Sequence, residues 1–181
     1  MKPVLVLYYS RSGATRQMAR LIARGVEEQG VETWLRTIDC AEPQDPVVTQ
    51  AELEEASALA LGSPTRFGGM AAPMKAFWDD TAAQWLAGSL VDKPACVFTS
   101  AASLHGGHES TLLTMMVPLL HHGMLVLGLP YTEPALHHTQ SGGTPYGPSH
   151  WALEKGISAD EKTLCLAMGR RLADIAKRMA P

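Results

Sequence analysis

Small hydroxyl side chains surround one glycine close to the start of the chain. Ser10, Ser12 and Thr15 flank Gly13 directly after a continuous apolar run at residues 4–9, VLVLYY. Such a run is typical of a parallel strand buried on both faces, and the residues that follow have the periodicity of a helix. At this junction, unpaired backbone N–H groups and the positive end of the helix dipole face outward. The loop is therefore suited to hold an anion, most often a phosphate.

The composition of the loop excludes two common nucleotide sites. A loop for nucleoside triphosphates, GxxxxGK(S/T), requires a lysine, and no lysine lies between Pro3 and Lys75. A dinucleotide fingerprint, GxGxxG, requires three glycines, whereas Gly13 is the single glycine here. The remaining neutral donors suit the terminal phosphate of FMN, and the loop resembles the phosphate loop of flavodoxins, (S/T)-x-(S/T)-G-x-T. Taken alone, the same residues also fit an ordinary serine-rich helix N-cap.

The overall composition indicates a globular protein. The 181 residues, 46% hydrophobic and 18% charged, match one domain with a full core, which we expect to span 1–181. A formal charge of -3 excludes a strongly basic surface for nucleic acid and is milder than the acidity of a small electron carrier. No apolar stretch reaches membrane-spanning length and no signal peptide precedes the first strand, so a cytoplasmic protein is expected.

The spacing of cysteines and histidines argues against a metal centre. Cys40, Cys96 and Cys165 are far apart and odd in number, so we expect reduced, structural thiols. All seven histidines lie between His105 and His150, and their adjacent pairs invite a metal hypothesis. Adjacent side chains on a helix point in different directions, however, and no cysteine or aspartate with metal-site spacing supports them. No metal site is expected.

Strands and helices alternate along the chain. After the first strand, further strands are expected at residues 31–38, 56–61, 95–100 and 124–129. Helices are expected at 14–29, 72–83, 111–122 and from Ser158 onward. The second strand alternates apolar and polar residues as an edge strand does, Ser158 forms a capping box with Glu161, and Pro118 predicts a kink or break. This order predicts an α/β fold with a doubly wound, five-stranded parallel sheet between two helix layers.

In such a sheet, ligands bind beyond the carboxyl ends of the strands, where the first and third strands lie side by side. The hydroxyl-rich loop meets two glycine-rich segments there, GSPTRFGGM at 62–70 and SAASLHGGHE at 100–109. Glycines let backbone N–H groups approach a flat ring closely. A response regulator of the same topology would need acidic residues at the ends of strands one and three, where this chain has Tyr8, Tyr9, Ser10 and Gly62. The sequence therefore favours a ligand site over a phosphoacceptor site.

Five segments in chain order carry a more specific resemblance. The chain resembles the WrbA family of NAD(P)H:quinone oxidoreductases, which has a flavodoxin-like fold, in LVLYYSRSGAT, GSPTRFGGM, FTSAASLHGGHESTLL, LLHHGM and GGTPYG. The resemblance implies FMN as the cofactor, NADH or NADPH as the electron donor and a quinone as the acceptor. It further implies two-electron reduction by a ping-pong transfer of hydride through the flavin, in a homo-tetramer.

The resemblance also implies functional residues. FMN would be bound by Ser10, Arg11, Ser12, Gly13, Ala14, Thr15, Thr65, Arg66, Phe67, Gly68, Ser100, Ala101, Ala102, Ser103, Leu104, His105 and Gly106. Trp85 would wall the substrate pocket, and His121 would lie at the reactive edge of the flavin, where it could hydrogen-bond a quinone oxygen. Ser12 stands where some members carry a tyrosine that contacts nicotinamide, and the segment between Ile38 and Glu52 is shorter than in longer members.

Two other classes of function stay open at this point. A flavodoxin-type carrier would bind FMN and pass single electrons without a substrate of its own, although the modest charge counts against it. A regulatory or interaction protein would need a partner-binding segment, and no residue pattern indicates one. The proline-rich stretch at 130–157 is long for a connection inside one domain. We expect it to pack against other parts of the protein, and the active site of a neighbouring subunit is one candidate location.

Overall fold

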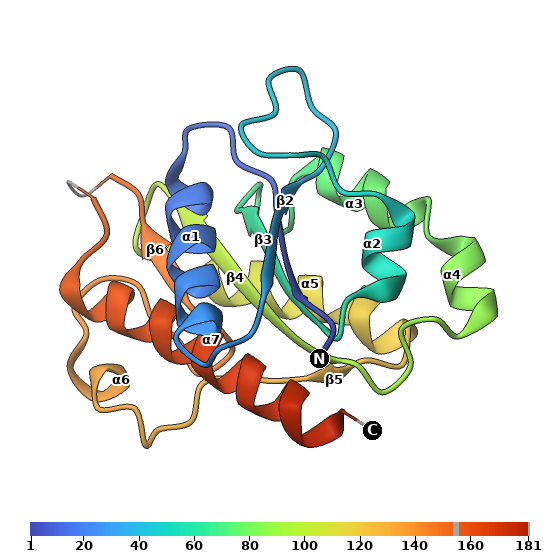
Figure 1. Cartoon of the computed structure of the whole chain (residues 1–181). Helices are drawn as coiled ribbons and strands as arrows, with labels where there is room; N and C mark the ends of the chain where they lie inside the picture. Colours follow the sequence, from blue (N-terminus) through green and yellow to red (C-terminus); the bar gives the residue numbers. More distant parts are fainter. Residues whose placement is uncertain (154–155, 181) are drawn as a thin grey trace.

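A parallel β-sheet forms the centre of the computed structural model, which describes residues 1–153 and 156–180. Its strands are β1 (Val4–Tyr8), β2 (Thr33–Thr37), β3 (Ala58–Pro64), β4 (Pro94–Ala101), β5 (Leu125–Val126) and β6 (Ser149–Trp151). The order β2-β1-β3-β4-β5 places β1 beside β3 and confirms the predicted doubly wound sheet (Figure 1). β6 was not predicted; it pairs in parallel with the carboxyl end of β4 and adds a sixth strand.

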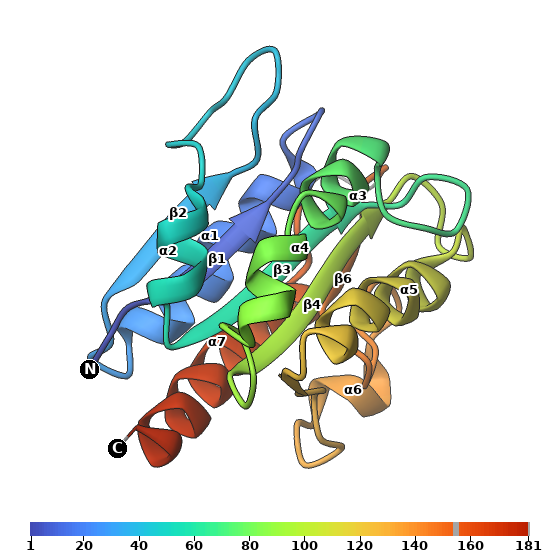
Figure 2. The ribbon, with the colours of Figure 1, turned by 90° about the vertical axis from the view of Figure 1, so that its right-hand side faces the viewer.

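Helices cover both faces of the sheet (Figures 1 and 2). One face carries α1 (Ala14–Glu27) and α7 (Ala159–Met179), with the short α6 (Ala135–His138) against α7. The other face carries α2 (Gln50–Glu55), α3 (Ala72–Asp79), α4 (Ala82–Ala87) and α5 (His108–His121). The predicted three-layer α/β/α arrangement is thereby confirmed.

The apolar side chains of β1 belong to two hydrophobic cores, one on each face of the sheet. Val4, Val6 and Tyr8 pack with α1 and α7, whereas Leu5 and Leu7 pack with the helices of the opposite face. This division follows from the strand itself, because successive side chains point to opposite sides of a sheet. All of β1, β3 and β4 is buried, while β2 is mostly half-buried at the edge, as its alternating pattern predicts.

Two glycines let α1 and α7 pack backbone against backbone. A Cβ atom at Gly169 would lie 2.1 Å from the carbonyl oxygen of Ile22, and one at Gly25 would lie 2.3 Å from that of Leu166. Neither position can accept a side chain unless the two helices separate. The contact therefore fixes α1, and with it the hydroxyl-rich loop at its N-terminus, against the C-terminal helix.

Two helices differ from their predicted bounds. The helix predicted at 72–83 is split into α3 and α4, and the Thr81 hydroxyl donates to the carbonyl oxygen of Trp78 (2.7 Å) where α3 ends. α5 starts at His108 rather than at residue 111, and it continues through Pro118. Of the expected kink or break at Pro118, the break does not occur, because a proline in the last turn removes one backbone hydrogen bond without ending the helix.

Capping boxes start two of the helices. The predicted box of α7 is present, since Ser158 Oγ accepts from the Glu161 N–H (3.2 Å) and Glu161 accepts from the Ser158 N–H (2.8 Å). α2 was not predicted, and Thr49 and Glu52 give it the same start. Of the helices within the described residues, none has both the length and the apolar character needed to span a lipid bilayer.

Candidate functional site

A cavity of about 350 Å³ opens beyond the carboxyl ends of β1, β3 and β4. Small-molecule sites usually have volumes of about 300–1,000 Å³. The cavity is lined by Ser10, Arg11, Ser12, Thr15, Pro64, Thr65, Arg66, Phe67, Ser100, Ala101, Ala102, Ser103, Gly106 and Ala152. The structure thus gathers most of the predicted cofactor residues around one space, and their binding role stays a prediction. Pro64 and Ala152 were not predicted.

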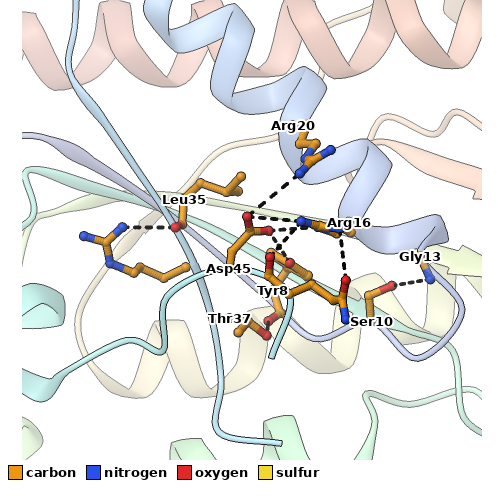
Figure 3. A network of polar contacts seen from close by, with 10 residues as sticks. Tyr8, Ser10, Gly13, Arg16, Arg20, Leu35, Thr37 and Asp45 are labelled. Carbon is orange, nitrogen blue, oxygen red and sulfur yellow. Dashed lines mark hydrogen bonds and ion pairs between the residues drawn. The ribbon is translucent and has the colours of Figure 1, made fainter. Parts of the chain in front are cut away.

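The other predicted residues belong to the same loops but do not line the cavity. They are Gly13, Ala14, Gly68, Leu104 and His105. Gly13 is required by the backbone, because it caps α1 with a φ of 91°, in the left-handed region that favours glycine. Its N–H donates to Ser10 Oγ (3.0 Å), which closes the loop (Figure 3).

Two buried hydroxyls join the first and third loops. Thr15 Oγ1 lies 2.9 Å from Ser100 Oγ, and the two residues are 1% and 3% exposed. Both line the cavity. A hydroxyl can donate as well as accept, so the pair offers at least one proton to a ligand oxygen. Thr15 belongs to α1 and Ser100 to β4, so the fold itself brings these groups together.

The charge of the cavity fits an anion. Arg11 and Arg66 contribute guanidinium groups, and none of the described lining residues carries a carboxylate. No side chain caps the N-terminus of α1, so the N–H groups of its first turn stay available. Neutral hydroxyls, free amides and two cations without a lysine suit a phosphate monoester. This donor set fits the phosphate of FMN.

The loop after β3 holds an aromatic ring in solvent at the cavity. Arg66 and Gly69 exchange two backbone hydrogen bonds (2.8 and 3.0 Å), which closes a tight turn. Phe67 within this turn has a φ of 50° and is fully exposed. A left-handed aromatic residue is strained, and such strain is concentrated at functional sites. Phe67 thereby presents an apolar face where a flat ring could lie.

Trp85 and His121 lie together, but in a different cavity. The Trp85 Nε1–H donates to the carbonyl oxygen of His121 (3.0 Å), so α4 is joined to the end of α5. Their cavity, of about 410 Å³, is also lined by Trp78, Thr81 and His122, and it shares no lining residue with the first. The structure therefore pairs the two predicted catalytic residues without placing them at the first cavity of the same chain, which lies beyond β1, β3 and β4 and is here called the cradle.

A polar network lies beside the hydroxyl-rich loop, and no pattern in the sequence predicted it. Asp45 Oδ2 accepts from the Tyr8 hydroxyl (2.5 Å) and from Arg16 Nε (2.9 Å), and Arg16 also donates to the carbonyl oxygen of Gln44 (2.7 Å; Figure 3). Burial alone would raise the pKa of Asp45, but the hydrogen bonds from Arg16 and Tyr8 lower it. Burial and the neighbouring Asp45 raise the pKa of Tyr8. The network fixes the loop between β2 and α2 beside the cradle.

The cysteines and paired histidines have separate structural environments. Cys96 and Cys165 are buried free thiols, and burial raises the pKa of both, which disfavours thiolate chemistry. His138 lies 3.3 Å from Asp160, whereas His137 lies 2.9 Å from the carbonyl oxygen of Tyr131. Across residues 1–153 and 156–180, no three metal-ligating side chains come together.

Comparison with known proteins points to one family. The profile of the family described as NADPH-dependent FMN reductase matches residues 3–133. A curated relative from Gluconacetobacter diazotrophicus, named NAD(P)H dehydrogenase (quinone), is 36% identical over 99% of this chain and 100% of its own length. One of the same name from Geotalea uraniireducens is 40% identical over 98% of both chains.

Solved structures agree with this assignment. A WrbA-like flavodoxin from Agrobacterium tumefaciens superposes with a TM-score of 0.79 at 26% identity, over 99% of this chain and 100% of that one. A flavodoxin from the domain Archaea superposes with a TM-score of 0.70 at 24% identity, over 97% and 99%. The second likeness concerns the fold alone, and the fold is flavodoxin-like.

Proposed function

Since the chain belongs to the NADPH-dependent FMN reductase family and groups with the WrbA-type NAD(P)H dehydrogenases (quinone), we propose that it is an FMN-dependent quinone reductase of the cytoplasm, where its electron donors are supplied. It would pass two electrons from NADH or NADPH to a quinone. The observation that supports this most is the cavity with two arginines, buried hydroxyls and no carboxylate among its described lining residues. When bound there, FMN would supply reversible hydride chemistry.

The residues of the cavity have distinct roles in this proposal. Ser12, Thr15 and the first-turn N–H groups of α1 would hold the phosphate. Phe67 would offer its exposed ring to the flat part of the cofactor. The guanidinium of Arg66 would favour negative charge in the same cavity. Because the cavity is open, a nicotinamide and a quinone could use the same side of it in turn.

Steady-state kinetics test this function. We expect the FMN-loaded protein to oxidise NADH or NADPH rapidly only when benzoquinone is present. Varying donor and quinone together should give parallel double-reciprocal lines, as a ping-pong scheme requires. Intersecting lines would contradict the ping-pong order, and a protein that binds FMN but shows no quinone-dependent oxidation would instead be a one-electron carrier.

A neighbouring subunit would complete the active site. Trp85, Leu86, Val117 and Leu120 are exposed apolar side chains on α4 and α5, around the cavity that holds His121. Monomeric proteins rarely expose such a cluster. We therefore propose that this face is buried between copies in a homo-tetramer, so that Trp85 and His121 of one copy reach the cradle of another.

Variants on this face separate assembly from cofactor binding. We expect Leu120→Glu to be monomeric in light scattering, because a carboxylate would be buried at the contact. It should retain FMN and lose quinone turnover. His121→Ala should stay tetrameric with FMN bound and lose about 100-fold in kcat/KM, and Trp85→Ala should mainly raise KM for the quinone. Thr163→Glu, on the exposed side of α7, is the control for one added negative charge. A wild-type monomer with full activity would exclude the shared site.

A further inference from the structure

Glu161, in the first turn of α7, is a buried carboxylate with more partners than a helix cap needs. It is 1% exposed. Its four donors are the N–H groups of Gly142 (2.8 Å), Trp151 (2.9 Å) and Ser158 (2.8 Å) and Nδ1 of His150 (2.9 Å). Burial alone would raise the pKa of Glu161, but these hydrogen bonds lower it to about 2. An ionised carboxylate only accepts, so His150 must donate from Nδ1.

Two of these donors belong to β6, which pairs with the end of β4 that lines the cofactor cavity. In the parallel ladder, His150 is paired with Ser100 and Trp151 with Ala101. The indole N–H of Trp151 donates to the carbonyl oxygen of Ala102 (3.2 Å). Ser100, Ala101 and Ala102 line the cavity. The strand that Glu161 holds therefore lies next to the part of the cavity lining formed by residues 100–102.

The residue after β6 enters the cavity itself. The Ala152 N–H donates to the carbonyl oxygen of Ala101 (2.8 Å), and Ala152 lines the cavity. β6 has only three residues, so its pairing with β4 cannot fix its position strongly by itself. Glu161 does not line the cavity and would act only through β6.

We propose that Glu161 is a positioning residue for the FMN site: its carboxylate, with His150, fixes β6 and thereby the wall formed by Ser100, Ala101, Ala102 and Ala152. The inference rests on the proposed FMN-dependent function. It predicts that the loss of this carboxylate weakens cofactor binding although no atom of Glu161 reaches the cavity.

The distribution of donors makes glutamine a poor replacement. Oε1 of Glu161 accepts from Gly142 and Trp151, and Oε2 accepts from His150 and Ser158. An amide has one oxygen, so in either orientation its NH₂ group would face at least one backbone N–H, which can only donate. Asp160 provides a matched control in the same helical turn. It carries the same charge beside the same helix dipole, but it is half-buried near His138 and accepts none of the hydrogen bonds from β6 that Glu161 accepts.

The test compares Glu161→Gln with Asp160→Asn, and adds His150→Ala as a milder variant that leaves the three backbone donors in place. FMN affinity is measured by fluorescence quenching on apoprotein, and hydrogen exchange of residues 100–102 is measured without FMN. We expect Glu161→Gln to weaken FMN binding by about tenfold and His150→Ala by about threefold relative to Asp160→Asn. Amide exchange at 100–102 should be faster in both.

Two outcomes decide between this inference and its premise. If Glu161→Gln unfolds at lower urea concentration but keeps wild-type FMN affinity and exchange, Glu161 stabilises α7 alone and the inference is overturned. If Glu161→Gln does not fold, the affinity and exchange of His150→Ala decide in the same way. If the wild-type protein binds no FMN, the proposed function fails, while faster exchange at 100–102 would still support the link through β6.

Discussion

Replacing Ser12 with aspartate is expected to weaken FMN binding by about 100-fold or more while the apoprotein stays folded. Ser12 is exposed and lines the cavity beside the first turn of α1. A carboxylate there would face a phosphate that carries a charge of about -1.5 to -2. Two unit charges about 5 Å apart repel by about 3 kcal/mol at an effective dielectric constant of about 20. Binding should therefore weaken by about 100-fold or more.

The added carboxylate is not expected to destabilise the folded apoprotein. A carboxylate next to the N-terminus of α1 interacts favourably with the helix dipole, by about 0.5 kcal/mol. The unfolding midpoint in urea should thus be unchanged or slightly higher. Asparagine has the size of aspartate but no charge, so the Ser12→Asn variant should bind FMN within about threefold of wild type. If Ser12→Asp binds as tightly as Ser12→Asn, the phosphate does not lie at this loop. Added salt should reduce the difference between the two variants.

Gly169→Val is expected to lower the free energy of unfolding by at least about 3 kcal/mol. The added Cβ would lie 2.1 Å from the carbonyl oxygen of Ile22, which is backbone and cannot rotate away. Relief requires α7 to move from α1 along a buried contact that includes Met168 and Leu172. Valine has a better helix propensity than glycine, so the loss cannot come from the helix itself.

Urea unfolding of the apoprotein measures this effect, and the same helix supplies a control. Lys162 is exposed on α7, and Lys162→Val adds the same branched side chain without a steric conflict. It should cost about 0.5 kcal/mol. If both variants unfold at the same urea concentration, the backbone contact between α1 and α7 is looser than the structure describes.

The fold could be predicted wherever a segment's own residues determine its environment. Continuous apolar runs predicted β1, β3 and β4, because strands covered on both faces are made mostly of apolar residues. β6 could not be predicted, since Ser149–Trp151 has no apolar run and is held by Glu161 and by β4. The predicted strand at 124–129 is shorter in the structure, because only two of its residues pair with β4.

In the candidate site, too, features made by neighbouring residues could be predicted, whereas contacts between distant segments could not. Ser10, Ser12 and Thr15 are neighbours in the sequence, so their spacing, together with the glycine-rich loops downstream, indicated an anion-binding loop. The link between Asp45 and Arg16 spans 29 residues, and no local pattern signals it. Arg16 therefore had no sequence feature that distinguished it from a surface residue. The separation of Trp85 and His121 from the cavity also depends on tertiary packing alone.

The anchoring at Asp45 makes the loop after β2 tolerant of insertions. Its first residue is held because the Ile38 N–H donates to the carbonyl oxygen of Tyr8 (3.3 Å), and its far end is held by Asp45 and by Pro46, which accepts from the Thr37 N–H (3.0 Å). Residues added between these anchors would lengthen a closed surface loop, and doubling its length costs only about 0.6 kcal/mol. Such additions could extend over the outer side of the hydroxyl-rich loop without displacing it. Loop length here can therefore vary independently of the cradle.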